Sequence, residues 1–333
     1  MSRLRRHPLA ILGTVLLVLV GASLLTGPLG VGLPPGVART PILLEIRLPR
    51  TLLALLIGGG LGIAGAALQG YLRNALAEPG LLGATGGAGL GAVIAIHTGA
   101  SAAVPLALPI GGLAGALVAT LAVLGLAAAG RSTAAAAGQH ALLISGVAVS
   151  TLATALISLA LNLSPNPFAA VEMVHWLMGS IADRSLDHVM LAGPAILAGA
   201  AVLARLGPDL DALSLGEDAA RNLGTDIDRV RWLIIIGTAL VVGAATAVAG
   251  TIGFVGLIVP HLLRPWVGAR PGPLLLASML GGAVLLLAAD IAIRLASPVG
   301  ELRLGVLTAL LGAPFFLWLI VAGPSDQRRG PLP

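Results

Sequence analysis

Long apolar runs separated by short polar segments dominate the hydropathy pattern of this chain. A helix needs about 20 apolar residues to cross roughly 30 Å of hydrocarbon. Runs close to that length cover residues 9–25, 52–70, 81–96, 104–129, 141–161, 189–206, 233–249, 274–293 and 304–321. A shorter run over residues 252–263 is ambiguous on length alone. Counted with it, the pattern predicts an all-α, polytopic membrane protein, a tightly packed bundle of about ten transmembrane helices in a single domain over residues 1–333.

The composition agrees with this pattern and removes several function classes. Hydrophobic residues make up 57% of the chain and charged residues 10%, whereas a soluble domain carries roughly 25% charged residues. This composition argues against a cytosolic enzyme, a secreted domain and a nucleic-acid binder, in spite of the net charge of +5. With no Cys, the chain has no disulfide, thiolate nucleophile or iron–sulfur cluster. All 19 basic residues are Arg, so a Walker A lysine is missing and any ATP-driven work falls to a partner.

The placement of arginine supports ten crossings and predicts an orientation. If the N-terminus lies inside, 13 Arg fall on the inner side and six on the outer side, as the positive-inside rule favours. The bias breaks for the C-terminal loops if the run over residues 252–263 is left out. We therefore expect a multi-pass protein of the inner (plasma) membrane with both termini in the cytoplasm. The first run is longer than the 7–15 residues of a signal-peptide core and is expected to be a span.

Glycine recurs at helical spacing and predicts close helix packing. Small residues four apart let two helix backbones approach in lipid. The faces expected to do so are Gly58/Gly62, Gly83/Gly87/Gly91 and Gly111/Gly115. Residues 60–65 also satisfy the dinucleotide pattern G-x-G-x-x-G, but they lie inside a span and Glu78 comes too early to serve as the acidic partner. We interpret that motif as helix packing.

Residues that could carry catalysis or bind a metal are sparse. Glu172 and His175 form one Glu-x-x-His unit, whereas a di-iron bundle needs two such units and two further Glu. An exposed helix on the outer side is the preferred interpretation. The remaining histidines show no ligand spacing, and no Ser/His/Asp set is apparent. We expect no metal site, no cofactor bound by this chain and no enzymatic activity.

The longest polar segment, over about residues 208–229, is expected on the cytoplasmic side. Ser214 and Glu217 have the spacing of a capping box, and Leu223-Gly224 has the form of a helix end with a glycine stop. The pattern predicts a short amphipathic helix that is acidic at its start. Such a helix fits a groove of another protein, and a plain solvated loop is the alternative.

Two further polar segments lie at predicted span ends. Residues 73–83 break a helix at Pro79-Gly80 and form either a gate at the inner mouth or a tight turn. On the outer side, Arg47 and Arg50 lie three residues apart, and Arg294 follows Asp290 by four. Arginines at membrane ends commonly extend to the headgroups. A cluster of them can also bind carboxylates of a docking protein or substrate.

Several blocks together carry a resemblance to a known family. They are RLPR at 47–50, NALAEPGLLG at 74–83, HWLMGS at 175–180, LGEDAARNLG at 215–224, GTIGFVGLIVPHLLR at 250–264 and GAPFFLWL at 312–319. In order and spacing, nearly the whole chain resembles the FecCD-type permeases of ABC importers for iron–siderophores, haem and vitamin B12. The resemblance implies a homodimer around one central pathway, embedded in lipid, with two ATPase subunits that bind ATP and Mg and a periplasmic substrate-binding protein.

The resemblance also assigns roles to residues of this chain. It implies an ATPase-coupling helix with contacts at Leu215, Gly216, Glu217, Asp218, Ala219, Leu223 and Gly224. It implies a cytoplasmic gate at Asn74, Ala75, Leu76 and Ser145, and binding-protein docking at Arg47, Arg50 and Arg294. Two positions depart from the family: Ala75 stands where Pro is usual, and Arg303-Leu304 stand where Pro-Val is usual. Arg303 adds an outer cation that is expected to join the docking set.

The implied function is import of a metal chelate by alternating access driven by the partner ATPase. By family frequency a ferric siderophore comes first as cargo, then haem, then vitamin B12. A stand-alone ion-coupled carrier is the alternative from another class. Such carriers usually bury ionisable residues mid-span, whereas the carboxylates here are expected at span ends. An intramembrane enzyme is disfavoured because no catalytic set shares one depth.

Overall fold

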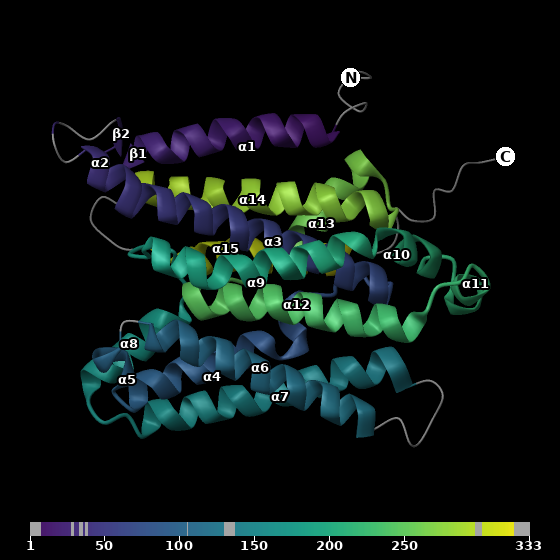
Figure 1. The fold of residues 1–333 in the computed structure, drawn as a ribbon, viewed down its shortest axis with the longest axis horizontal. Coiled ribbons are helices and arrows are strands. Elements are labelled where there is room, and N and C mark those ends of the chain that lie inside the picture. The colour runs from purple at the N-terminus through teal and green to yellow at the C-terminus, as the bar shows by residue number, and fades with distance from the viewer. Residues whose placement is uncertain are drawn as a thin grey trace.

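The computed structural model describes residues 8–27, 30–32, 36, 39–104, 106–129, 137–296 and 302–322. Nearly all of the described chain is helical, and the long helices run side by side along one axis (Figure 1). The short helices α10 and α11 lie at one end of this bundle, called the α11 end below. The short helix α8 and a two-stranded ribbon lie at the opposite end, called the α8 end.

The predicted apolar runs each become a helix within the described residues. These helices are α1 (Pro8–Leu25), α3 (Leu48–Leu72), α4 (Ala84–His97), α6 (Ala107–Ala129), α7 (Ala137–Asn162), α9 (Leu186–Arg205), α12 (Ile227–Ala249), α13 (Val255–Val267), α14 (Pro271–Ala296) and α15 (Leu304–Ala322). The connecting elements are β1 (Thr26–Gly27), β2 (Gly30–Val31), α2 (Arg39–Pro41), the π-helix η3 (Ile42–Arg47), the 3-10 helix η4 (Pro79–Leu82), α5 (Ala100–Ala103), α8 (Pro167–Leu177), α10 (Gly207–Leu213) and α11 (Glu217–Asn222). Seven described helices are long and apolar enough to cross a membrane. The predicted all-α membrane fold is confirmed.

Two of the predicted membrane crossings contain a helix that is too short to span the hydrocarbon layer alone. α4 has 14 residues and α13 has 13, so at 1.5 Å per residue each is about 20 Å long. Two irregular segments, residues 73–83 with the single 3-10 turn η4 and residues 250–254, precede them and fold back into the bundle, where Ala77, Pro79 and Ile252 are buried. Irregular backbone at membrane depth is tolerated only where protein surrounds it or where it lines a cavity. The polar groups of both segments therefore need partners inside the protein.

Glycine faces join the long helices, as predicted. On α3, a Cβ added at Gly58 would overlap the backbone of Gly282 on α14, and one added at Gly62 would overlap Ser278. On α4, Gly87 and Gly91 approach α6 in the same way. Their counterparts on α6 are Gly115 and Gly111. The G-x-G-x-x-G motif lies within α3, which confirms the packing interpretation.

Gly83 is the exception among the predicted packing glycines. Its φ of +82° places it in the left-handed region at the N-cap of α4, a conformation that glycine adopts at little cost. It therefore turns the chain from η4 into α4 and is not part of a helix–helix face.

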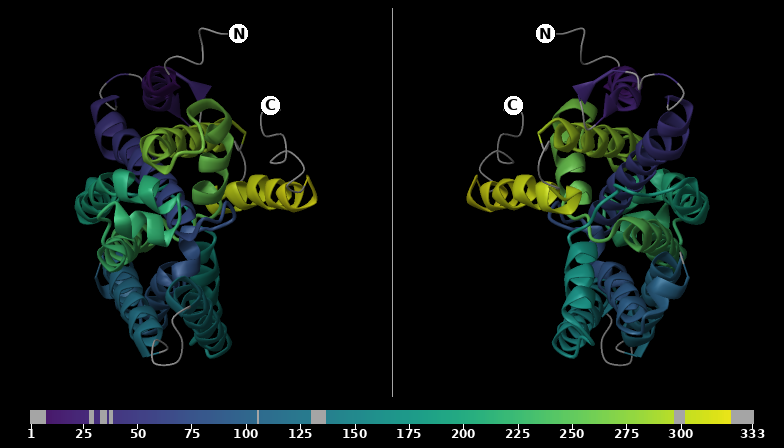
Figure 2. Two further views of the ribbon diagram at one scale, coloured as in Figure 1. Left: turned by 90° about the vertical axis from the view of Figure 1, so that its right-hand side faces the viewer. Right: turned by 90° about the vertical axis from the view of Figure 1, so that its left-hand side faces the viewer.

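The last helix stands apart from the others. α15 projects from one side of the bundle and touches it along one flank (Figure 2). Its contacts are with α13 and α14, and they include an edge-to-face contact between the Phe315 and His261 rings at 5.5 Å. Large apolar side chains on α15 remain exposed, among them Leu310, Leu317 and Trp318.

A buried ionic network joins three helices at the α8 end. Asp290 of α14 is fully buried; its Oδ1 accepts a 2.7 Å hydrogen bond from Arg50 Nε. Its Oδ2 accepts hydrogen bonds from Arg294, one of them from Nε at 2.9 Å. Arg294 also donates to the hydroxyl and carbonyl oxygens of Ser23 and to the carbonyl of Thr26. The network fixes the end of α1 against α3 and α14.

Arg294 does not extend to the headgroups, which was the alternative to a docking role for arginines at membrane ends. Arg294 and Arg47 are both 8% exposed. Arg47 Nη1 donates to the carbonyls of Leu24 and Gly32 at 2.8 and 2.9 Å. The last carbonyls of a helix have no partner within it, and the two guanidinium groups satisfy those at the end of α1. That need explains why both arginines turn inward.

We predict that the glycine contact between α3 and α13 limits stability. A Cβ at Gly65 would overlap the carbonyl of Gly256, whereas nothing lies within 4 Å of a Cβ at Gly125 on α6. Overpacking a tight contact typically costs about 1–3 kcal/mol, so Gly65→Ala lowers the thermal unfolding temperature in detergent. Gly125→Ala is the matched control. Equal unfolding temperatures for the two variants would contradict the prediction.

We predict a larger loss for Asp290→Asn. The change leaves the Arg294 guanidinium buried without its counter-ion, and breaking a buried pair costs about 3–5 kcal/mol. Thermal unfolding followed by tryptophan fluorescence measures the effect. Glu172→Gln, an exposed change on α8 at the same end, is the control that leaves the unfolding temperature in place.

Candidate functional site

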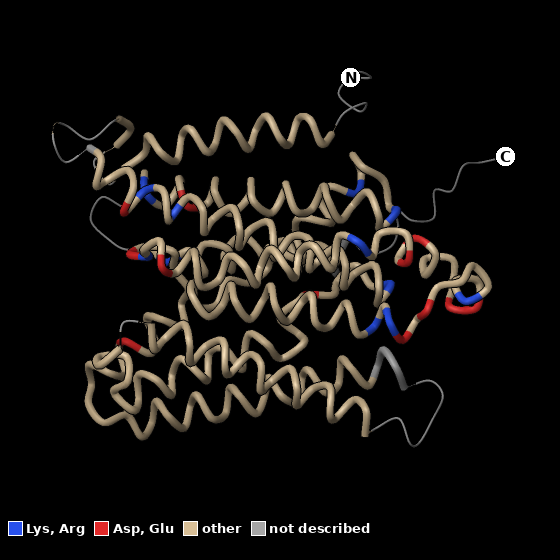
Figure 3. Tube along the Cα trace, in the orientation of Figure 1, with Lys and Arg blue, Asp and Glu red and all other residues tan. Residues whose placement is uncertain are grey.

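Charged residues gather at the two ends of the bundle, and the middle is almost free of them (Figure 3). The α11 end carries the segment expected to contact an ATPase and the turn expected to act as a gate. The α8 end carries the arginines expected to dock a binding protein. Each site is therefore built where helices end and polar side chains reach water.

The segment over residues 208–229 contains two short helices. α10 is anchored to the bundle because Leu210 and Leu213 are fully buried. Asp211 fixes it to the start of α14: Oδ1 accepts the Gly272 N–H at 2.8 Å, and Oδ2 pairs with Arg270 Nη2 at 2.9 Å. α10 thus forms a firm base for the helix that follows.

α11 presents a mixed acidic and apolar surface beyond this base. Leu215 and Leu223 flank it and are 69% and 66% exposed. Asp218 is exposed, and Glu217 is half-buried and pairs with Arg221 at 3.7 Å. Ala219 is half-buried, and Ala220 below it is buried. The helix therefore turns a small-residue side inward and an acidic first turn outward.

The predicted end of α11 is confirmed. Gly224 has a φ of +88°, and the Thr225 N–H reaches back to the Ala220 carbonyl at 2.9 Å while the Gly224 N–H reaches that of Arg221 at 3.0 Å. These two bonds form a Schellman motif, for which glycine at this position is preferred. Gly224 thus stops the helix and turns the chain toward α12.

The predicted capping box at Ser214 is wrong. Ser214 ends α10, and its Oγ donates to the Asp211 carbonyl at 2.6 Å. α11 begins three residues later, after Gly216, whose φ of +109° separates the two helices. The sequence rule failed because α10 extends to Leu213, so Ser214 belongs to the last turn of one helix and not to the first turn of the next.

The predicted gate residues form a turn at the α11 end of α3. Asn74 Oδ1 accepts the Leu76 N–H at 2.9 Å, a local bond that Asn favours in turns. Leu76 is exposed and Ala75 half-buried. Ser145 on α7 is buried, and the next residue, Gly146, is so close to η4 that a Cβ would overlap the Leu81 carbonyl. The structure therefore places Ser145 beside the segment that continues from this turn.

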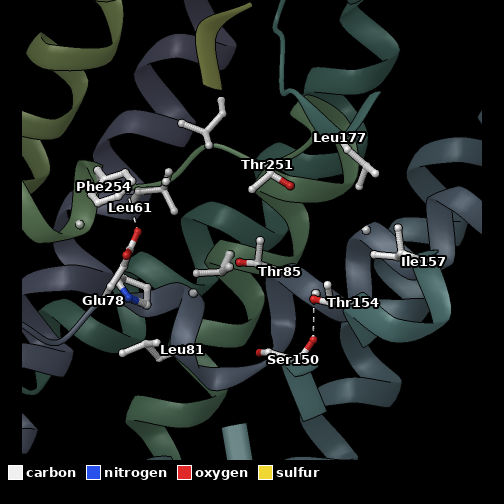
Figure 4. Close-up of a pocket in the computed structure, with 18 residues that line it drawn as sticks. Leu61, Glu78, Leu81, Thr85, Ser150, Thr154, Ile157, Leu177, Thr251 and Phe254 are labelled. Carbon is white, nitrogen blue, oxygen red and sulfur yellow. Dashed lines mark hydrogen bonds between the residues drawn. The ribbon is translucent and has the colours of Figure 1, made fainter. Parts of the chain in front are cut away.

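A cavity of about 410 Å³ lies between these elements. Its polar lining includes Glu78, Thr85, Ser150, Thr154 and Thr251, from the 73–83 segment, α4, α7 and the 250–254 segment (Figure 4). Among the described residues the buried Ser150 hydroxyl has no hydrogen-bond partner. The cavity offers hydroxyl groups and one carboxylate within an apolar wall.

Sequence reasoning missed Glu78 as a functional candidate. It was expected at a span end, but it faces the cavity, and its Oε1 accepts the Phe254 N–H at 2.7 Å (Figure 4). The local signal was an acidic residue directly before Pro79-Gly80, followed by an apolar run over residues 81–96 that is shorter than a full membrane span. Together these features indicate a segment that re-enters the bundle.

The four predicted docking arginines all lie at the α8 end. Arg50 and Arg303 are partly exposed. The segment that carries Arg303 is tied to the chain after α8 by the Gly305 N–H, which donates to the Gly179 carbonyl at 3.1 Å. Arg47 and Arg294 have the internal roles described above. Docking remains a prediction for all four.

Comparison with known proteins gives the family. The sequence profile of the FecCD transport family matches residues 9–322. The vitamin B12 import system permease protein BtuC of Vibrio cholerae serotype O1 is 44% identical over 83% of this chain and 82% of its own length. BtuC of Vibrio vulnificus is 38% identical over 95% of this chain and 94% of its own. The uncharacterized ABC transporter permease protein YvrB of Bacillus subtilis is 39% identical over 87% and 80%.

Solved structures agree with this assignment. An inward-facing ABC transporter, described provisionally as of the metal-chelate type, matches with a TM-score of 0.83 and 32% identity over 94% of this chain and 98% of the other. PsaBC from Streptococcus pneumoniae in complex with Fab matches with a TM-score of 0.54 and 19% identity over 82% and 91%, which supports the fold alone. The predicted resemblance is confirmed: this chain belongs to the FecCD transport family, as a multi-pass inner-membrane permease subunit of an ABC importer.

Proposed function

We propose that this permease moves a metal chelate from the periplasm to the cytoplasm by alternating access, and that its first candidate cargo is a cobalt corrinoid of the vitamin B12 type. Membership of the family implies an ATPase partner and a binding protein. The similarity to BtuC relatives over more than four fifths of the chain carries the corrinoid proposal. A ferric siderophore, which family frequency put first, and haem are the alternative cargoes.

α11 is the proposed contact with the ATPase. Its exposed Leu215 and Leu223 supply apolar area, and Asp218 with Glu217 supplies negative charge beside the positive helix N-terminus. An amphipathic helix of this kind is suited to a groove of a partner. Asp211 and the buried leucines hold α10 to the bundle. A displacement of α11 is therefore transmitted to the membrane helices, because no flexible linker lies between them.

A second copy of the chain is proposed to close the cavity. α7 and α15 expose apolar side chains on both sides of it, including Ile144, Val147 and Leu152 on α7 and Leu317 on α15. Two copies related by a two-fold axis would bury these side chains and enclose one central pathway between the two cavities. The Thr154 and Ser150 hydroxyls would then face that pathway.

The α8 end is proposed to face the periplasm and to dock the binding protein, which puts the α11 end and both termini in the cytoplasm. Arg50 and Arg303 are the side chains best placed for a partner carboxylate. Arg294 supports that surface because it shares Asp290 with Arg50 and so helps to hold Arg50 in position. Arg47 supports it by binding the carbonyl of Leu24 at the end of α1 and that of Gly32. Electrostatic contacts of this kind give specificity and a fast association rate.

A stand-alone ion-coupled carrier remains the second candidate because of Glu78. A carboxylate that faces a cavity within a membrane protein is typical of proton and ion pathways. The two functions differ in one dependence: the importer requires hydrolysis by its ATPase, whereas the carrier requires an ion gradient and no nucleotide.

Charge reversal on α11 tests the coupling contact. The double change Glu217→Arg and Asp218→Arg replaces the acidic first turn by like charge next to the helix dipole and is expected to abolish co-purification with the ATPase and uptake. Glu172→Arg, at the opposite end, is the control for ATPase association. Retention of both association and uptake by the double variant would show that α11 is not the coupling element.

Reconstituted uptake tests cargo and energy source together. Proteoliposomes that contain the permease, its ATPase and its binding protein are expected to accumulate cobalamin when ATP is present. An ATPase whose Walker A lysine is replaced is expected to stop that uptake, since the permease has no such lysine. Uptake of a ferric siderophore or haem in place of cobalamin would reassign the cargo. Uptake with the inactive ATPase and an ion gradient would support the carrier.

A further inference from the structure

Two irregular segments at membrane depth are joined by one hydrogen bond from a backbone N–H to a side chain. Residues 73–83, which contain the predicted gate turn, are called the gate segment below. Glu78 of this segment accepts the backbone N–H of Phe254 at 2.7 Å. The two residues are 176 positions apart in sequence. A buried backbone N–H without an acceptor is costly, and Glu78 removes that cost, so the gate segment and the start of α13 are firmly connected.

Phe254 is held in a conformation that needs outside support. Its φ of +68° lies in the left-handed region, which is a strained state for a bulky residue. It is the N-cap residue of α13, where backbone N–H groups lack partners within the helix. Glu78 supplies one acceptor at this helix end. On the other side, the Phe254 ring fills the place that a side chain at Gly312 of α15 would take.

A second set of contacts holds the same two segments together. Gln69 is almost fully buried, and its Nε2 donates to the carbonyls of Ala77, Gly256 and Leu257 at 3.3–3.4 Å. Its Oε1 accepts from Arg264 Nη2 at 2.7 Å. One side chain thus bonds to the gate segment and to both ends of α13.

The far end of α13 reaches the proposed ATPase contact. α13 ends at Gly268, with a φ of +99°, and a short turn leads directly into α14. That turn is where Asp211 of α10 holds Arg270 and the Gly272 N–H. Contacts therefore run without interruption from α10, through the turn, along α13 and to the gate segment.

We propose that α13 is a rigid lever that transmits movement of α10 and α11 to the gate segment, with Asp211 and Glu78 as the positioning residues at its two ends. Pro260 and Pro265 lie inside α13 and remove two of its internal hydrogen bonds. The helix keeps its shape because it packs along α3 and α14 and because Gln69 bonds to residues near both of its ends. The proposal rests on the proposed coupling role of α11. The proposal also gives the buried Glu78 side chain a role that requires no bound ion, because its carboxyl group binds the Phe254 N–H. No cluster of three metal-ligating side chains occurs within the described ranges.

Replacement of Glu78 separates the hydrogen bond from its charge. In proteoliposomes with ATPase and binding protein, Glu78→Leu removes the acceptor and is expected to lower cargo uptake per ATP hydrolysed about tenfold, a coupling loss of ordinary size between distant sites. Glu78→Gln retains a carbonyl acceptor and is expected to rescue most of that loss. Thr120→Val is the control, because this buried hydroxyl bonds only within its own helix. Wild-type coupling in Glu78→Leu, or failure of rescue by Gln, would overturn the lever.

Replacement of Asp211 tests the other end of the proposed α13 lever. If both residues act through α13, the double variant Glu78→Leu/Asp211→Leu couples no worse than the more impaired single variant, because effects within one connected unit are not additive. If the logarithms of the two single-variant losses in uptake per ATP simply add up in the double variant, the two residues act at independent sites. That result would overturn the proposal.

Label distances test the movement directly, and the absence of Cys makes labelling clean. Spin labels at Leu76→Cys and Leu262→Cys, both exposed positions, report on the gate turn and α13. In the complex with the ATPase, the distribution of distances between the two labels is expected to stay single and narrow when ATP is added. In the Glu78→Leu variant we expect this distribution to broaden. A wild-type distance that changes with ATP overturns the lever. If the distances behave as expected but no tested chelate is taken up, the cargo proposal fails and the lever stands.

Discussion

Every backbone N–H and C=O group at membrane depth has to find its partner inside the protein, and this constraint explains most of the structure. Helices meet it within themselves. The irregular segments need help from side chains: Gln69 donates to the Ala77 carbonyl in residues 73–83, and Glu78 accepts the Phe254 N–H in residues 250–254. Gln69 and Glu78 therefore mark the places where the helical pattern is interrupted.

The same requirement governs the ends of complete helices. Arg47 and Arg294 donate to the last carbonyls of α1, and Asp211 accepts an N–H at the start of α14. A charged group that serves a helix end also fixes the angle at which another helix meets it, because its own position is set by the helix that carries it. Each of these side chains thus orients a pair of helices as well as satisfying a backbone group.

The helices and glycine faces could be predicted from sequence because length, hydropathy and four-residue spacing are local properties. The inward roles of Arg294 and Glu78 could not, because their partners lie 271 and 176 positions away. Ser214 shows a different limit: its capping pattern was present, but the preceding helix continued one turn further and took the residue. The coupling, gate and docking roles came from resemblance, and the structure supplies their geometry without testing them.

A permease that alternates between two states needs parts that stay intact and a boundary along which they shift. Backbone contact at glycine locks α3 to α14 and α4 to α6, since any sliding would drive one backbone into the other. The cavity lies between these pairs, with α4 and α7 on one wall and the 250–254 segment on another. Among the helices that the structure describes, α12 alone packs broadly on both pairs. The side of the cavity formed by α4 and α7 is therefore the boundary at which a displacement disturbs the fewest close contacts, and Glu78 holds the 73–83 and 250–254 segments together beside it.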